Sequence, residues 1–202
     1  MGKVTEIKKN DKKTINGWAF YDWANSAYPL VITTAIFPIF YESATSTTVD
    51  GVTNDVVYFL GMHFKNTELY SYVVALSFVF VCFLSPLLSG IADYSDSKKK
   101  FLKFFSLLGS LSCASLFFFD ADYLEISMIP VLLASIGFWA SLVFYNAYLP
   151  EIASPDRHDR VSAKGFSLGY LGASILLIFC LILVQFWGVW EDTPEWCFPL
   201  VG

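Results

Sequence analysis

Charged residues are scarce in this sequence. Lys, Arg, Asp and Glu make up 15% of the 202 residues, whereas 55% of the residues are hydrophobic. A soluble domain of this length carries about a quarter charged residues, because it must present a wetted surface. The hydrophobic residues also fall in long blocks, so most of the surface is expected to face lipid.

Several chemical motifs are absent as well. The cysteines lie far apart, without a CxxC pair or a histidine cluster, so neither a disulfide framework nor a metal site is expected. The net charge is −5 and no basic face is present, which argues against nucleic acid as a partner. Neither the D-G-x-x-A-R run of a phospholipid-headgroup transferase nor the Ser–His or paired-Asp site of an intramembrane protease occurs. We therefore expect no catalytic residues and no cofactor.

Five apolar blocks are long enough to cross a bilayer, which takes about 20 helical residues. Each should be helical, because lipid cannot satisfy bare backbone polar groups. The sequence predicts an all-α polytopic membrane protein in which residues 1–16 form a cytoplasmic segment and residues 17–202 a transmembrane helical domain. The five predicted spans are residues 17–41, 69–91, 101–119, 127–149 and 166–187. Pro199 to Gly202 is expected to open a sixth span.

The basic residues are distributed unevenly among the connections. All but one of the 13 Lys and Arg residues precede the first block, lie between blocks two and three or four and five, or, in the case of Lys103, stand at the start of block three. Cytoplasmic loops are enriched in Lys and Arg, so the N-terminus is expected in the cytoplasm. The 42–68 connection then lies outside, where Val56–Leu60 is expected to form a short surface helix without an assigned role.

Polar residues recur along one face of the first block. Tyr21, Asp22, Asn25 and Tyr28 are spaced as residues on one helical stripe. An ionisable group within a span costs roughly 2.5–3.5 kcal/mol at the centre and less near an end. Two interpretations of Asp22 stay open. It is either an interfacial carboxylate favoured by the helix dipole, or part of a stripe that faces a water-filled cavity.

The connections on the basic side carry the other candidate residues. Asp93 ends the second block, and Lys98, Lys99 and Lys100 follow, a pattern that a simple polar turn would also explain. The connection between blocks four and five holds a charge cluster that includes Glu151, Arg157 and Arg160. Small residues then recur at i, i+4 and i+7 of the fifth block and predict a helix-packing face, formed by Gly165, Gly169 and Gly172.

The turn between the second and third blocks resembles the signature of the major facilitator superfamily, usually written G-x-L-A-D-R-x-G-R-R/K. Ala92, Asp93 and Lys98–Lys99 match that signature, whereas Ser89 and Asp96 stand at its glycine positions. Two longer strings, INGWAFYDWANSAYPLVITTAIFP and FYNAYLPEIA…RVSAKGFSLGYLG, resemble the N-terminal half of the vacuolar amino-acid effluxer-like branch of that superfamily, which has many bacterial members.

This resemblance implies a secondary transporter in which two six-helix halves rock around a central site. It implies an amino acid as the small-molecule substrate, a bacterial inner membrane and a C-terminal half beyond this chain as partner. Asp93, the three lysines and the charge cluster would form a cytoplasmic gate. Asn146, within the second string, joins the cavity candidates. A non-transporting membrane subunit or scaffold, or a membrane-embedded lipid-modifying enzyme, remains the alternative.

Overall fold

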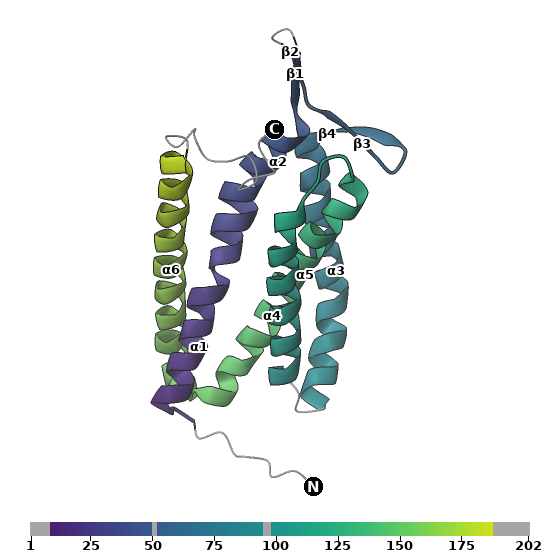
Figure 1. Cartoon of the computed structure of the whole chain (residues 1–202). Helices are drawn as coiled ribbons and strands as arrows, with labels where there is room; N and C mark the ends of the chain where they lie inside the picture. Colours follow the sequence, from purple (N-terminus) through teal and green to yellow (C-terminus); the bar gives the residue numbers. More distant parts are fainter. Residues whose placement is uncertain (1–8, 50–51, 95–97, 188–202) are drawn as a thin grey trace.

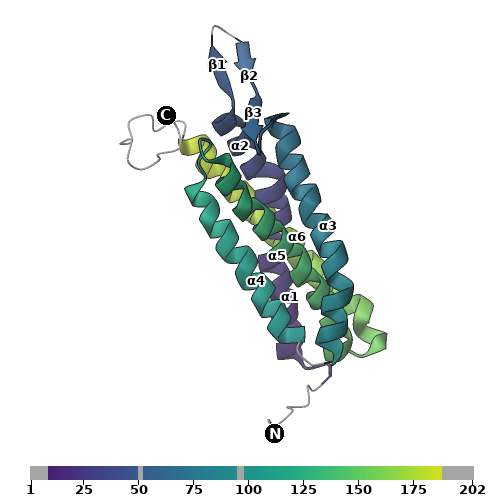
Figure 2. The same cartoon turned by 90° about the vertical axis from the view of Figure 1, so that its right-hand side faces the viewer.

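The computed structural model describes residues 9–49, 52–94 and 98–187. These residues form a long, narrow helical bundle with small β-hairpins at one end, as Figure 1 shows and the quarter turn in Figure 2 repeats. The predicted opening of a sixth span, Pro199 to Gly202, lies outside the described residues. In chain order the elements are α1 (Lys12–Asn25), the π-helix η1 (Tyr28–Ile36), α2 (Phe37–Thr45), β1 (Thr47–Val49), β2 (Val52–Asn54), β3 (Val56–Phe59), β4 (Met62–Lys65), α3 (Asn66–Tyr94), α4 (Lys98–Ser115), the 3₁₀ turn η2 (Leu116–Phe118), α5 (Leu124–Ile152), the 3₁₀ turn η3 (Pro155–Arg157) and α6 (His158–Trp187).

The first predicted span is one helical rod whose middle is a π-helix rather than an α-helix. Pro29 and Pro38 have no amide hydrogen, so each interrupts the usual pairing of the backbone. Pro38 would be the i+5 partner of the Thr33 carbonyl. That carbonyl instead accepts a hydrogen bond from the hydroxyl of Tyr70, at 2.9 Å, on α3. A side chain of the neighbouring helix thus replaces the missing backbone donor.

Three of the other predicted spans, 69–91, 127–149 and 166–187, each lie within one helix, namely α3, α5 and α6. The predicted span 101–119 covers most of α4 and the 3₁₀ turn η2 and ends one residue after that turn. Within the described residues, four helical stretches are long and apolar enough to cross a membrane, namely 66–90, 98–118, 124–152 and 155–186. Many of their large apolar side chains point outward, among them Phe83 on α3 and Phe179 on α6. An outward apolar surface of this kind suits lipid as the surrounding solvent.

The expected surface helix at Val56–Leu60 is wrong. The segment forms β3, which pairs antiparallel with β4 from Val56 opposite Lys65 to Phe59 opposite Met62. Val56 and Val57 are β-branched and favour a strand. The two residues that join the strands, Leu60 and Gly61, have φ angles of +49° and +85°, as a tight two-residue hairpin turn requires.

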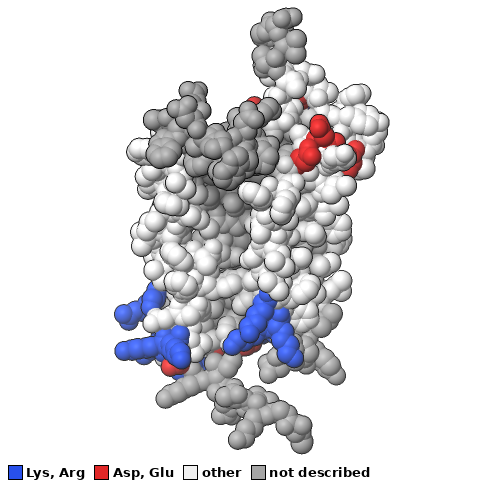
Figure 3. All heavy atoms as spheres, viewed as in Figure 1, with Lys and Arg blue, Asp and Glu red and all other residues white. Residues whose placement is uncertain are grey.

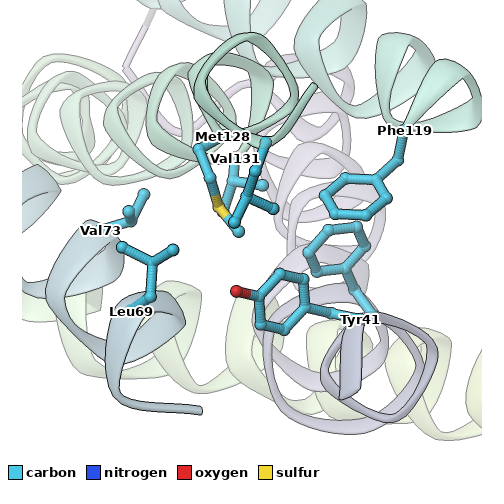
Figure 4. Close-up of a cluster of buried hydrophobic side chains, with 8 residues drawn as sticks. Tyr41, Leu69, Val73, Phe119, Met128 and Val131 are labelled. Atoms are coloured by element: carbon cyan, nitrogen blue, oxygen red, sulfur yellow. The ribbon is translucent and has the colours of Figure 1, made fainter. Parts of the chain in front are cut away.

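The buried apolar side chains gather towards the two ends of the bundle. At the hairpin end, a cluster joins α2, α3, α5 and the segment after η2, and Figure 4 shows Tyr41, Leu69 and Phe119 converging in it. At the opposite end, Trp18, Tyr145 and Ile152 join α1 to α5. The first cluster thus holds α2 against α5 at the hairpin end, and the second holds α1 against α5 at the opposite end.

Helices α4 and α5 cross in direct backbone contact. A methyl group added to Gly137 would lie 2.5 Å from the backbone nitrogen of Gly109, which leaves no room for a side chain there. Glycine is therefore required at position 137 for the two helices to approach this closely.

Charge divides along the bundle. In Figure 3 the basic side chains gather at the end where α1, α4 and α6 begin, whereas acidic side chains lie beside the hairpin end. This distribution agrees with the sequence, in which connections rich in Lys and Arg alternate with connections that contain almost none. The direction in which the bundle crosses the membrane stays a prediction.

Candidate functional site

A cavity of about 300 Å³ lies between the first rod and α4, with α5 as its floor. Most of its wall is apolar, and its polar groups are few: Asn25 and Tyr28 from the first rod, Ser106 and Ser110 from α4, and Ser141 from α5. Apolar walls with a few placed polar groups are typical of small-molecule sites. Two residues of the predicted cavity stripe, Asn25 and Tyr28, thus line a cavity.

A larger cavity, of about 690 Å³, lies on the side of the basic end. Ser106 and Ser110 line it as well as the smaller one, so the two cavities adjoin. Tyr21, a third residue of the predicted stripe, lines the larger cavity and shares a 2.7 Å hydrogen bond with the hydroxyl of Ser106. Three basic side chains also line it, namely Lys13, Lys99 and Lys103.

Asp22 lines neither of these cavities and lies against α6. Its side chain is 6% exposed, and its Oδ2 would be 3.4 Å and 3.2 Å from methyl groups placed on Gly165 and Gly169. Ser26, one turn further along the rod, also contacts Gly169. The small residues of α6 therefore admit the polar side of α1 at close range. Neither sequence interpretation of Asp22 anticipated this helix-packing position.

Gly172 continues the same contact, because a methyl group there would overlap the ring of Trp23. Gly165, Gly169 and Gly172 thus form one face of α6 that lies along α1.

Tyr145 on α5 completes the surroundings of Asp22. Its ring stacks on Trp18 with centroids 4.1 Å apart, and the indole nitrogen of Trp18 donates to the Tyr145 carbonyl at 3.0 Å. Its hydroxyl is buried and has no hydrogen-bond partner among the residues that the structure describes. Tyr145 was not predicted as a site residue, because in the sequence an aromatic residue within an apolar block cannot be told from a lipid-facing one.

Asn146, the remaining cavity candidate, is exposed on α5 and lines neither cavity. Ser106 and Ser110, which do line both cavities, were not predicted. Their spacing of four residues within the third block is the signal that would have placed both on one helical face.

At the basic end, the structure brings two of the predicted gate residues together. Lys98 at the start of α4 pairs with Glu151 at the end of α5, at 2.8 Å, and both side chains are partly buried. Lys99 faces the larger cavity and Lys100 is exposed. The side chain of Asp93 lies outside what the structure describes.

The remaining gate candidates lie apart from that pair. Arg157 is 3.8 Å from Asp156, and both are exposed. Arg160 is exposed on the first turn of α6. A hydrogen bond from Ser154, assisted by Arg157, holds the pKa of Asp156 below its usual value. Elsewhere in the described ranges, no three acidic, histidine or cysteine side chains meet in a way that could hold a metal ion.

This chain matches only part of the length of each curated relative. YxiO, an uncharacterised MFS-type transporter of Bacillus subtilis, is 37% identical over 178 residues, which are 88% of this chain and 39% of that protein. Autophagy-related protein 22 of Coccidioides immitis is 24% identical over 182 residues, 75% of this chain and 30% of that protein. An uncharacterised protein of Aquifex aeolicus is 28% identical over 176 residues, 87% of this chain and 40% of that protein. The chain therefore spans less than half the length of these relatives.

The family resemblance seen in the sequence is confirmed. The model of the family described as vacuole effluxer Atg22 like matches residues 10–201, and one of the relatives is named as an MFS-type transporter. No solved structure matches the chain. With its apolar helices of membrane-spanning length, the chain is an integral, multi-pass membrane protein of the all-α class. It belongs to the vacuole effluxer Atg22-like family.

Proposed function

We propose that this chain is the N-terminal portion of a secondary transporter that moves a small solute across the membrane by alternating access. The observation that carries the proposal is the cavity with a few polar groups among membrane-spanning helices, which adjoins a second cavity at the basic end. Such an arrangement supplies half of a central site and one route to it. The names of the relatives support a transporter, and no covalent step is needed.

The proposed substrate class is the amino acids. Asn25, Tyr28 and three serines offer neutral donors and acceptors to the smaller cavity. Neutral groups of this kind suit a small solute whose own charges cancel, as those of a zwitterion do. The sequence resemblance to vacuolar amino-acid effluxers points to the same class. Asn146 stays a cavity candidate for the complete protein, in which further helices would face this one, whereas Asp22 packs against α6 beside the cavities.

The proposed gate lies at the basic end. The Lys98–Glu151 pair joins the start of α4 to the end of α5, beside the larger cavity. Asp93, Lys99, Lys100, Arg157 and Arg160 belong to the same gate in this proposal. Charged pairs at helix ends suit such a role, because they break and form again as two helical units rock.

The proposal also places the molecule in its surroundings. The basic end faces the cytoplasm, as the positive-inside rule requires, and the membrane is a bacterial inner membrane. The partners are the lipid bilayer, the solute and a C-terminal half of the transporter.

The test is solute uptake by the complete transporter in proteoliposomes with labelled neutral amino acids. We expect saturable uptake that Asn25→Leu lowers at least about tenfold, because the amide lines the cavity and leucine fits its volume without its hydrogen bonds. The matched control is Asn54→Leu, at an exposed hairpin position. Flux that saturates for other solutes only would refute the substrate class. Absence of any flux from a folded protein would favour the alternative, a membrane subunit, scaffold or lipid-modifying enzyme.

A further inference from the structure

We infer that Asp22 and Tyr145 form a proton-binding site enclosed by α1, α5 and α6. The two side chains are 6% and 3% exposed and converge on Gly165. A methyl group placed on Gly165 would lie 2.8 Å from the Tyr145 hydroxyl and 3.4 Å from Asp22 Oδ2. Within the described residues, the Tyr145 hydroxyl has no hydrogen-bond partner. A buried carboxylate and a buried, unpartnered hydroxyl thus meet at one point.

The space at this point fits a proton and nothing larger. Helix α6 presents backbone alone at Gly165 and Gly169, and a single added methyl group would already touch the surrounding side chains. A solute molecule has no room there. A metal cation needs about four or more ligand atoms, whereas one carboxylate and one hydroxyl are present. A proton neutralises the carboxylate and takes up no volume.

The groups that face Asp22 leave its charge unneutralised. Among the described residues of α5, Tyr145 is the titratable group that faces Gly165 together with Asp22, and on α1 itself Tyr21 is directed to Ser106 of α4. Lys164, the basic residue beside Gly165 on α6, donates to the side chain of Asn16 instead, at 2.5 Å. A carboxylate buried without a paired cation is unfavourable, so protonation is the way to remove its charge.

The larger cavity supplies a route for the proton. Trp18 and Tyr145 line that cavity, and the same two rings also contact the position of Gly165. They therefore form the boundary between the cavity and Asp22, and the proton crosses it through the Tyr145 hydroxyl. A hydronium ion gives a proton to this hydroxyl, which passes its own proton to Asp22 Oδ2, so the products are a neutral carboxylic acid, an unchanged hydroxyl and a water molecule. The acid then donates a hydrogen bond to the Tyr145 hydroxyl oxygen, and the buried negative charge is removed.

The use of this proton rests on the proposed function. Asn25, which lines the smaller cavity, follows Asp22 by three residues on α1, so the two lie about one helical turn apart. A change of charge at the α1–α6 contact would change the position of α1 relative to α6. Because α1 carries Asn25, the wall of the solute cavity would change as well. The proton site is therefore placed to couple a proton gradient to solute movement.

Infrared spectroscopy of the purified 202-residue chain in lipid nanodiscs tests the site directly. The difference spectrum between acidic and alkaline buffer should contain the C=O stretch of one protonated carboxylic acid at a frequency above those of exposed acids. Asp22→Asn should abolish this band. Tyr145→Phe should keep the band and shift it upward, because the acid loses its hydrogen-bond partner. Spectra of Asp22→Asn that superimpose on those of the unaltered chain would overturn the inference.

Two controls keep the result interpretable. Asp120→Asn removes an exposed carboxylate outside the helices and should leave the Asp22 band in place. Circular dichroism reports whether each variant keeps its helices. If Asp22→Asn does not fold, the Tyr145→Phe spectrum decides, and a band that is absent or unshifted in it overturns the site.

A transport measurement separates the site from its use. In the complete transporter, Asp22→Asn should abolish accumulation driven by a proton gradient and keep exchange of solute across the membrane. Accumulation equal to that of the unaltered protein would overturn the coupling. A transporter without any flux would refute the proposed function, whereas the infrared band decides the proton site in either case.

Discussion

At the scale of single residues, glycine sets the closest contacts in this bundle. The two glycines at the α4–α5 crossing are not equivalent. A methyl group on Gly137 would lie 2.5 Å and 2.6 Å from backbone atoms of Gly109, whereas one on Gly109 would lie 3.4 Å from backbone atoms of Gly137. The first distance forces the helices apart, and the second is an ordinary contact.

We therefore expect Gly137→Ala to lower the free energy of unfolding by about 1–3 kcal/mol, as overpacking does. Gly109→Ala should leave it unchanged or raise it slightly, because alanine favours a helix over glycine by up to about 1 kcal/mol. The measurement is unfolding of both variants in mild detergent with increasing denaturant, followed by circular dichroism. Equal losses from the two changes would contradict the geometry of the crossing.

A second residue-scale contact holds the N-terminal end of the bundle. Asn10 has a φ of +64°, and its side chain both donates to the Ser154 hydroxyl and accepts from the Ser154 amide. Its own amide donates to the Ile152 carbonyl at 2.8 Å. Asparagine tolerates the left-handed conformation better than other non-glycine residues, so both its backbone and its amide group suit this place.

Asn10→Ala should lower the free energy of unfolding by about 1–3 kcal/mol, through the lost hydrogen bonds and the left-handed backbone. Asn16→Ala, on the exposed side of α1, is the matched control and should cost less. Thermal unfolding of both variants measures the difference, and no difference between them would mean that the Ser154 contact contributes nothing.

At the scale of elements, the sequence predicts where the helices lie but not how the first rod is built. Long apolar blocks identify spans, because any helix must satisfy its backbone in lipid. The π-helix depends on a partner in another element: the Tyr70 hydroxyl on α3 replaces the amide that Pro38 lacks. A pairing between residues 37 positions apart leaves no periodic signal. The same holds for Asp22, whose position against α6 depends on glycines more than 140 residues later.

The replacement of the Pro38 amide by the Tyr70 hydroxyl can be tested by measuring the energetic coupling between residues 38 and 70. Tyr70→Phe should cost about 1–3 kcal/mol of unfolding free energy, because it leaves the Thr33 carbonyl without its donor. In a Pro38→Ala background the same change should cost less, since the alanine amide can then donate to that carbonyl. A double-mutant cycle gives the difference. Additive effects of the two changes would show that the hydroxyl does not stand in for the amide.

The contact between the ends of α4 and α5 makes a separate prediction for transport. Lys98→Glu and Glu151→Lys should each slow solute exchange in the complete transporter severalfold, because each places two like charges where a 2.8 Å ion pair now joins the proposed gate. The double exchange should restore most of the rate. Initial rates of uptake measure this. A double variant as slow as either single one would argue against the pair as a gate element.

At the scale of the whole molecule, the direction of the bundle in the membrane follows from its basic end. Lys100 lies exposed in the first turn of α4, at that end, and Thr53 lies exposed in β2, in the hairpins at the other end. After removal of the native cysteines, Thr53→Cys should react with an impermeant thiol reagent added to intact cells, and Lys100→Cys should not. Labelling in permeabilised cells serves as the control for accessibility. The reverse pattern would invert the assignment of the gate to the cytoplasm.

The last expectation concerns the chain by itself, which should transport nothing. The walls of the smaller cavity come from the first rod, α4 and α5 alone, and alternating access needs a second unit against which these helices rock. The 202-residue chain in proteoliposomes should therefore give no saturable uptake of labelled neutral amino acids, with or without a proton gradient. The complete transporter, reconstituted in parallel, is the positive control. Saturable, gradient-driven uptake by the chain alone would mean that copies of it assemble a pathway together, and its proposed role as one portion of a transporter would be wrong.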